Sequence, residues 1–109
     1  MDRTKLLEQR AQARAAKRLR DAGVLTFHER AVAALLDPDQ GRAVREQAFA
    51  SIDLWERGQL CEPWYIDTWR AILALPAASV AAAILRTDDD GVALRQNSPF
   101  GFMMRQVVP

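Results

Sequence analysis

The chain has 109 residues, of which 50% are hydrophobic and 27% are charged. This length suits a single domain, and this composition is typical of a folded globular protein rather than a disordered or fibrous chain. One cysteine and one histidine exclude an internal disulfide bond and a zinc site built from cysteine and histidine alone. We therefore expect neither a metal nor a cofactor, and the net charge of +1 gives no overall attraction to nucleic acid.

The sequence indicates a cytoplasmic protein that does not bind membranes. Residues 1–22 carry basic side chains throughout and lack the apolar run of a secretory signal peptide. The longest stretch without a charged residue, Ala71–Leu85, is rich in alanine and too short to cross a bilayer. A lone cysteine fits a reducing compartment. Arginine outnumbers lysine 13 to 2, which indicates a GC-rich and therefore bacterial source.

The first half of the chain predicts three helices. The first covers about Thr4–Ala22 and is stopped by Gly23, the residue type that commonly follows a helix end. The second begins after Thr26, which has the capping-box spacing with Glu29, and ends before the proline at position 38. The third covers about residues 38–57, with Asp37 as its cap.

The second half predicts two more helices and a tail. One opens at Pro63, with Glu62 at the cap position, and ends near Pro76. The next covers about residues 76–86 and ends at the acidic turn 88–91. Residues 92–109 show no clear period, and no segment has the alternation of a strand.

These elements predict an all-α fold, a small bundle of four to five helices with an irregular C-terminal tail. We expect three regions: a basic N-terminal helical arm at residues 1–23, a helical bundle at 24–91, and a C-terminal tail at 92–109 that either packs on the bundle or binds a partner. Apolar faces on the predicted helices supply the expected core. They include Val44, Ala48 and Ile52 in the third helix, and Ile66, Trp69 and Leu73 in the fourth.

The N-terminal arm carries the clearest charge signal. Residues 1–22 hold seven basic and three acidic residues, a net charge of +4, while the remaining 87 residues carry −3. Four of the basic residues fall on one side of the predicted helix: Arg10, Arg14, Lys17 and Arg18. Leu7, Ala11, Ala15 and Leu19 form a narrow apolar stripe. The arm is therefore either a solvated helix packed by its stripe, a contact for nucleic-acid phosphates, or a contact for an acidic partner such as a second copy of the chain.

Aromatic and tail residues form the second set of candidate contacts. Trp64 is predicted to point away from the apolar face of its helix. It either packs on the tail or on the helix predicted at residues 38–57, or it lies exposed, where a tryptophan is a suitable anchor for a partner. The tail residues Arg95, Phe100, Phe102 and Met103 either fold back over the bundle or belong to a peptide that orders on a partner. Both interpretations of the tail remain open at this point.

The sequence contains no convincing catalytic or ligand-binding motif. Cys61 precedes a predicted helix N-terminus, where the helix dipole would stabilise a thiolate, but His28 is the only imidazole base and the pairing is explained by chance. Residues 88–91 do not fit a calcium loop, and residues 51–73 do not fit a helix-turn-helix reader. We predict a non-enzymatic interaction or regulatory protein (an adaptor, an inhibitor or an antitoxin-like protein) that binds a protein partner. The alternative is a nucleic-acid-associated protein that contacts phosphates through the arm.

Overall fold

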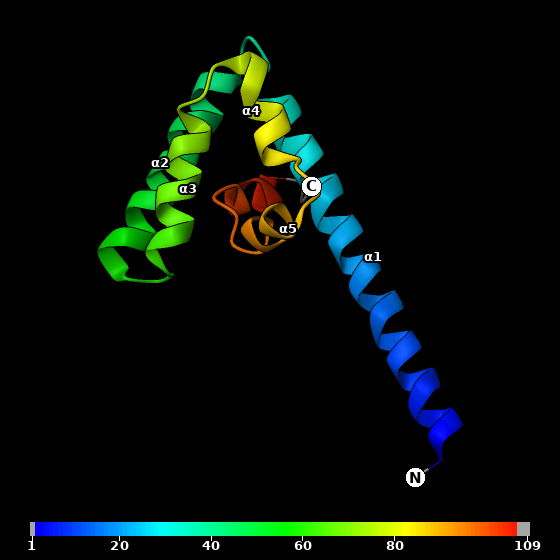
Figure 1. The fold of residues 1–109 in the computed structure, drawn as a ribbon. Helices are drawn as coiled ribbons and strands as arrows, with labels where there is room; N and C mark the ends of the chain where they lie inside the picture. Colours follow the sequence, from blue (N-terminus) through cyan, green and yellow to red (C-terminus); the bar gives the residue numbers. More distant parts are fainter. Residues whose placement is uncertain (1, 107–109) are drawn as a thin grey trace.

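The computed structural model describes residues 2–106 and confirms the all-α prediction, since these residues form helices and no strand. The elements, in chain order, are α1 (Arg3–Leu35), α2 (Gly41–Gly58), α3 (Pro63–Leu73), α4 (Ala77–Ile84), α5 (Asp89–Arg95) and the 3₁₀ helix η1 (Gly101–Gln106). In Figure 1, α1 and the α2–α3 pair diverge from the α1–α2 turn, while α4 and α5 occupy the space between them.

The first two predicted helices are a single helix of 33 residues, so the prediction of a stop at Gly23 is wrong. Thr26 does not cap a new helix; its hydroxyl donates a hydrogen bond to the carbonyl oxygen of Ala22 at 3.0 Å, one turn earlier. The N-cap of α1 is Asp2, whose carboxylate accepts the backbone N–H of Thr4. A glycine inside a helix costs only about 1 kcal/mol, which the strong helix formers on both sides can offset.

The junction between α1 and α2 is closely packed. The carboxylate of Asp37 accepts the backbone N–H groups of Asp39 and Gln40 in the turn before α2. The helix itself begins at Gly41 with Gln40 at the N-cap position, so the prediction of Asp37 as its cap is wrong. A Cβ atom at Gly41 would lie 2.2 Å from the carbonyl oxygen of Leu35. Glycine is therefore required where the start of α2 crosses the end of α1.

The later helices follow the predicted boundaries more closely. α3 begins at Pro63 with Glu62 at the cap position, and it ends before Pro76. α4 is shorter than predicted. The predicted acidic turn instead starts α5, because the carboxylate of Asp88 accepts the backbone N–H of Gly91 at 3.0 Å.

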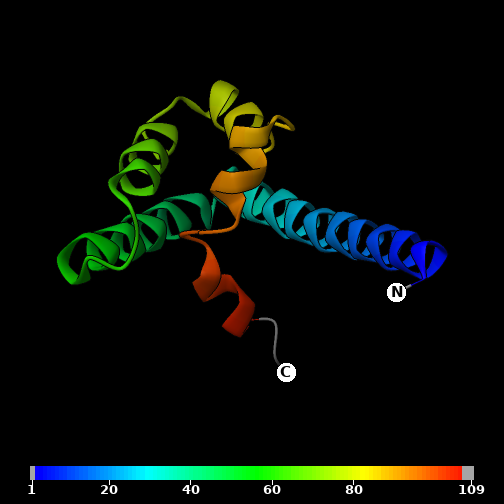
Figure 2. The same cartoon turned by 60° about the horizontal axis from the view of Figure 1, so that its bottom comes forward.

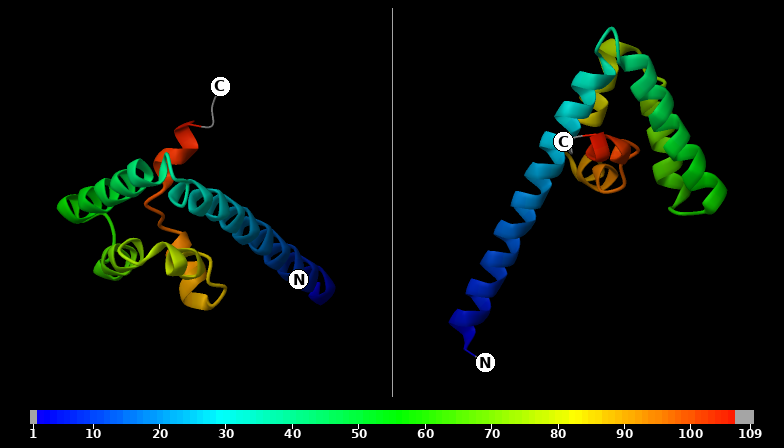
Figure 3. Two further views of the ribbon diagram at one scale, coloured as in Figure 1. Left: turned by 90° about the horizontal axis from the view of Figure 1, so that it is seen from above. Right: turned by 180° about the vertical axis from the view of Figure 1, so that it is seen from behind.

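The core joins all five α-helices and the segment after α5. The predicted apolar faces of α2 and α3 are buried in it. Its members are Ala31, Val32, Leu35, Val44, Ala48, Ile52, Ile66, Trp69, Ile72, Leu73, Val80, Ile84, Leu94 and Phe100. All the α1 residues in this set come from its C-terminal third, which places the core at that end of the helix. The N-terminal part of α1 extends away from the other helices (Figures 2 and 3).

The C-terminal region is more regular than predicted, because residues 89–95 and 101–106 are helical. Phe100 is fully buried, so the interpretation in which this region folds back over the bundle is the one observed. Trp69 donates from its indole Nε1 to the carbonyl oxygen of Asn97 at 2.8 Å. This bond and the aromatic contact between Trp69 and Phe100 hold the segment after α5 against α3.

Candidate interaction surface

Residues 3–20 of α1, here called the projecting segment, are the longest run of almost entirely exposed residues in the described part of the chain. Every residue in it is exposed except Leu6, which is half-buried. Leu7 and Leu19 have exposed fractions of 55% and 77%, which are high for large apolar side chains. The apolar stripe predicted for this helix is therefore not packed against any described part of the chain.

The basic side of the projecting segment is also free. Arg10, Arg14, Lys17 and Arg18 are all exposed. Lys17 pairs with Asp21 at 2.7 Å, which is the one ion pair in this part of α1 among the described residues. Arg10, Arg14 and Arg18 follow one another at four-residue spacing, where like charges destabilise a helix. An acidic surface alongside this segment would therefore stabilise it.

Two properties of the projecting segment favour a binding role. Isolated helices of this length are marginally stable in water, because most helical stability in proteins comes from packing of an apolar face. Here the C-terminal third of α1 is fixed in the core by residues such as Ala31 and Leu35, which holds the exposed turns in one direction. The result is a preformed helix that presents leucine and arginine side chains to solvent.

A second exposed surface lies at the end of the α2–α3 pair, here called the hairpin tip. Trp64 is 41% exposed and packs edge-on against Tyr65, while Leu54 and Leu60 are 55% and 65% exposed. A cavity of about 340 Å³ lies beside them, lined by residues that include Glu56, Cys61 and Ile66. Trp64 therefore lies partly exposed near the start of α3, and its role as a partner contact stays a prediction.

Ion pairs connect the two helices of the hairpin. Arg70 donates to Asp53 and to Glu56, each at 2.8 Å, and its bond to Glu56 holds the pKa of that carboxyl below its ordinary value. Such exposed pairs contribute little to stability. Because both acids pair with Arg70, they are not free to bind a basic partner. The distinctive feature of the hairpin tip is therefore its exposed apolar side chains.

Of the four tail residues predicted to contact a partner, two are partly exposed and two are buried. Phe102 and Met103 are half-buried, whereas Phe100 is fully buried and Arg95 is only 5% exposed. Arg95 turns inward because its guanidinium donates to the carbonyl oxygens of Ile84 and Arg86 at the C-terminal end of α4. A partner can therefore touch Phe102 and Met103, but it could reach Phe100 or Arg95 only by displacing the segment from the core.

His28 has a structural place in the core. Its ring Nδ1–H donates to the carbonyl oxygen of Val24, and its Nε2 accepts from the hydroxyl of Ser98, both at 2.8 Å; this tautomer follows from the carbonyl partner. The Ser98 oxygen in turn accepts the backbone N–H of Phe100. Burial, with a smaller effect of nearby Arg95, lowers the pKa of His28, so the neutral ring is favoured.

Cys61 is a half-buried free cysteine just before the start of α3. Burial and the nearby carboxylate of Glu62 raise its pKa, which opposes the stabilisation expected from the helix dipole. His28 and Cys61 line two different cavities, one beside α1 and one at the hairpin tip. Within residues 2–106, no group of three or more histidine, cysteine or acidic residues is placed to hold a metal ion, and no helix there is long and apolar enough to span a bilayer.

Comparison with protein-family models, with curated proteins and with solved structures gives no match for this chain.

Proposed function

We propose that this protein is a non-enzymatic interaction protein and that the projecting segment of α1 binds a protein partner in the bacterial cytoplasm. One observation carries the proposal: a regular helix, fixed at one end in the core, is exposed over residues 3–20 together with Leu7 and Leu19. Burying a leucine side chain contributes about 1.5–3 kcal/mol. Leu7 and Leu19 lie roughly 120° apart around the helix, so a partner groove that wraps around the segment would bury both.

The charges beside the leucines define the chemistry of the partner. Leu7, Arg14 and Arg18 are separated by seven and eleven residues, so they lie on the same face of the helix. A complementary surface would be an apolar groove with acidic side chains along its rim. The partner is a separate protein or a second copy of this chain, whose residues after the first 22 carry a net charge of −3.

Capture from cells tests the proposal. Tagged full-length protein is recovered from nuclease-treated lysate of its source cell and compared with a Leu7→Ser, Leu19→Ser variant. The proposal expects a stoichiometric partner with the natural chain and its loss with the variant. Leu54→Ser is a matched control, because Leu54 on the hairpin tip is as exposed as Leu7 but lies outside the projecting segment. A partner retained by the double variant and lost by the control would contradict the proposal and point to the hairpin tip.

Nucleic-acid binding by the same segment is the second candidate function. It is favoured by the exposure of Arg10, Arg14, Lys17 and Arg18 on one regular helix, since these cations could contact successive phosphates. Binding to duplex DNA or RNA would weaken steeply with salt, and the slope would fall by about one for each arginine replaced by glutamine. Replacement of the same arginines by lysine, which keeps the charge, should leave the slope unchanged. Weak binding with no dependence on salt would refute this function.

A further inference from the structure

A cavity of about 300 Å³ lies between α1 and the C-terminal elements, and neither Leu7 nor Leu19 of the projecting segment lines it. α1 contributes Gly23, Val24 and Phe27 to its wall, and the C-terminal elements contribute Arg95, Gly101 and Met104. The wall is mostly apolar, but it includes Arg95, which is the one charged side chain that is buried among the described residues.

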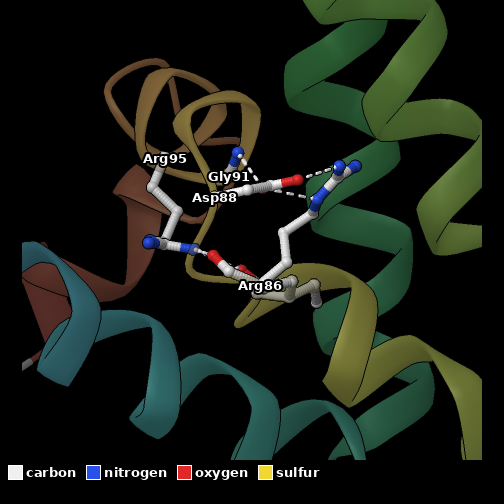
Figure 4. Close-up of polar contacts among 5 residues, drawn as sticks. Arg86, Asp88, Gly91 and Arg95 are labelled. Atoms are coloured by element: carbon white, nitrogen blue, oxygen red, sulfur yellow. Dashed lines mark hydrogen bonds and ion pairs between the residues drawn. The ribbon is translucent and has the colours of Figure 1, made fainter.

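Arg95 uses only part of its hydrogen-bonding capacity inside the fold. Its Nη1 donates to the carbonyl oxygen of Ile84 at 3.0 Å and to that of Arg86 at 2.7 Å, and Figure 4 shows the side chain reaching from α5 to this backbone. No acceptor for Nε or Nη2 occurs within the described part of the chain. No described side-chain nitrogen or oxygen is both fully buried and unpartnered, so these two nitrogens keep some exposure to solvent, and Arg95 is one of the residues that line the cavity.

The acids whose charge acts on Arg95 already have other partners. Asp88 pairs with Arg86 and caps α5, and Asp21 pairs with Lys17 at 2.7 Å. Within the described residues, neither acid forms an ion pair with Arg95. A guanidinium that has lost most of its hydration and has no carboxylate partner is costly to bury, so a bound anion would stabilise it.

The free edge of Arg95 determines which anion fits. The N–H bonds of Nε and Nη2 run parallel along one side of a planar guanidinium, and this edge matches the two oxygens of a carboxylate. The adjoining Val24, Phe27 and Met104 favour a hydrocarbon group attached to that carboxylate. A volume near 300 Å³ is at the small end for ligand cavities, which restricts the hydrocarbon part to a short chain.

We propose that this cavity binds a short-chain monocarboxylate, with its carboxylate on the Nε and Nη2 edge of Arg95 and its hydrocarbon chain against Val24, Phe27 and Met104. The site is independent of partner binding by the projecting segment. It requires no bond-making step, since the ligand is held by ionic, hydrogen-bonding and apolar contacts alone.

Titration of the full chain with hexanoate, followed by calorimetry and by NMR of the Arg95 side-chain Nε–H, tests the site. Hexanamide is the control ligand, because it has the same shape without the charge. We expect hexanoate to bind roughly ten-fold more tightly than hexanamide or better, and to shift the Arg95 Nε–H resonance. Equal binding of the two compounds, no binding of hexanoate, or binding without that shift would overturn the proposal.

Two kinds of variant test whether the ligand binds in this cavity. Arg95→Lys keeps the charge but removes the planar edge, and it should weaken hexanoate binding roughly ten-fold. Since this change also removes bonds to α4, Gly23→Leu provides a test that leaves Arg95 intact. A Cβ atom at Gly23 meets nothing within 4 Å, so a leucine side chain has room to enter the cavity and exclude the ligand. Gly23→Ala, which adds a Cβ alone, should bind hexanoate normally; unchanged binding by Gly23→Leu would overturn the proposal.

Discussion

Replacement of Gly23 by alanine tests the continuity of α1, on which the position of the projecting segment depends. Gly23 lies inside a continuous helix, none of the described glycines has a positive φ, and an added Cβ atom would contact nothing within 4 Å. Alanine should therefore stabilise the protein by about 0.5–1 kcal/mol, because it restricts the unfolded chain without straining the folded one. For a chain of this size, the midpoint of thermal unfolding should rise by about 2–6 °C.

Urea unfolding followed by tryptophan fluorescence and by helical circular dichroism measures this change. If the chain broke at Gly23 as a glycine-terminated helix end, with a left-handed backbone, alanine would instead destabilise the protein by about 1 kcal/mol. The sign of the change therefore decides between one helix and two. Gly41→Ala is the matched control, since its Cβ atom would lie 2.2 Å from the Leu35 carbonyl oxygen. It should destabilise the protein by about 1–3 kcal/mol.

Three further predictions concern the C-terminal region and the surface. Because the pKa of His28 is lowered in the fold, the unfolded chain takes up a proton first as the pH falls below 6.5, so the free energy of unfolding should decline there. This decline, measured by urea unfolding above pH 4.5, should be absent in His28→Gln, and a pH-independent free energy in the natural chain would contradict the buried neutral ring. Phe100→Ala should cost about 3–5 kcal/mol in the same assay, whereas a cost below about 1 kcal/mol would mean that the C-terminal segment is not part of the core. Arg70→Gln should leave the thermal midpoint nearly unchanged, because its two ion pairs are exposed to water; a large fall would show that these pairs hold α2 against α3.

Local rules of sequence predicted most of the bundle. Pro63 marks the start of α3 because its fixed φ suits a first helical turn, and the apolar faces of α2 and α3 follow the helical period. The predicted stop at Gly23 is wrong because a glycine is compatible with both the end and the interior of a helix. Only the helix-forming residues on both sides decide which state is adopted.

The C-terminal region depends on contacts that no local pattern encodes. Ser98 bonds to His28, 70 residues away in sequence, and Asn97 bonds to Trp69, 28 residues away. The short α5 has too few turns to show a period. The sequence leaves Arg95 either packed or in contact with a partner. Its burial depends on backbone carbonyl oxygens at the end of α4 that accept from its guanidinium, and the sequence does not show which carbonyls lie within reach.

Site-specific photo-crosslinking in the source cell tests the proposed function most directly. A photoreactive residue is placed at Leu7 in the projecting segment and, in a separate protein, at Leu54 on the hairpin tip; both positions are 55% exposed. We predict a discrete protein adduct from position 7 that survives nuclease treatment and is absent from position 54; an adduct of twice the mass of the chain would identify a second copy. No adduct at position 7, or the same adducts from both positions, would contradict partner binding by the projecting segment.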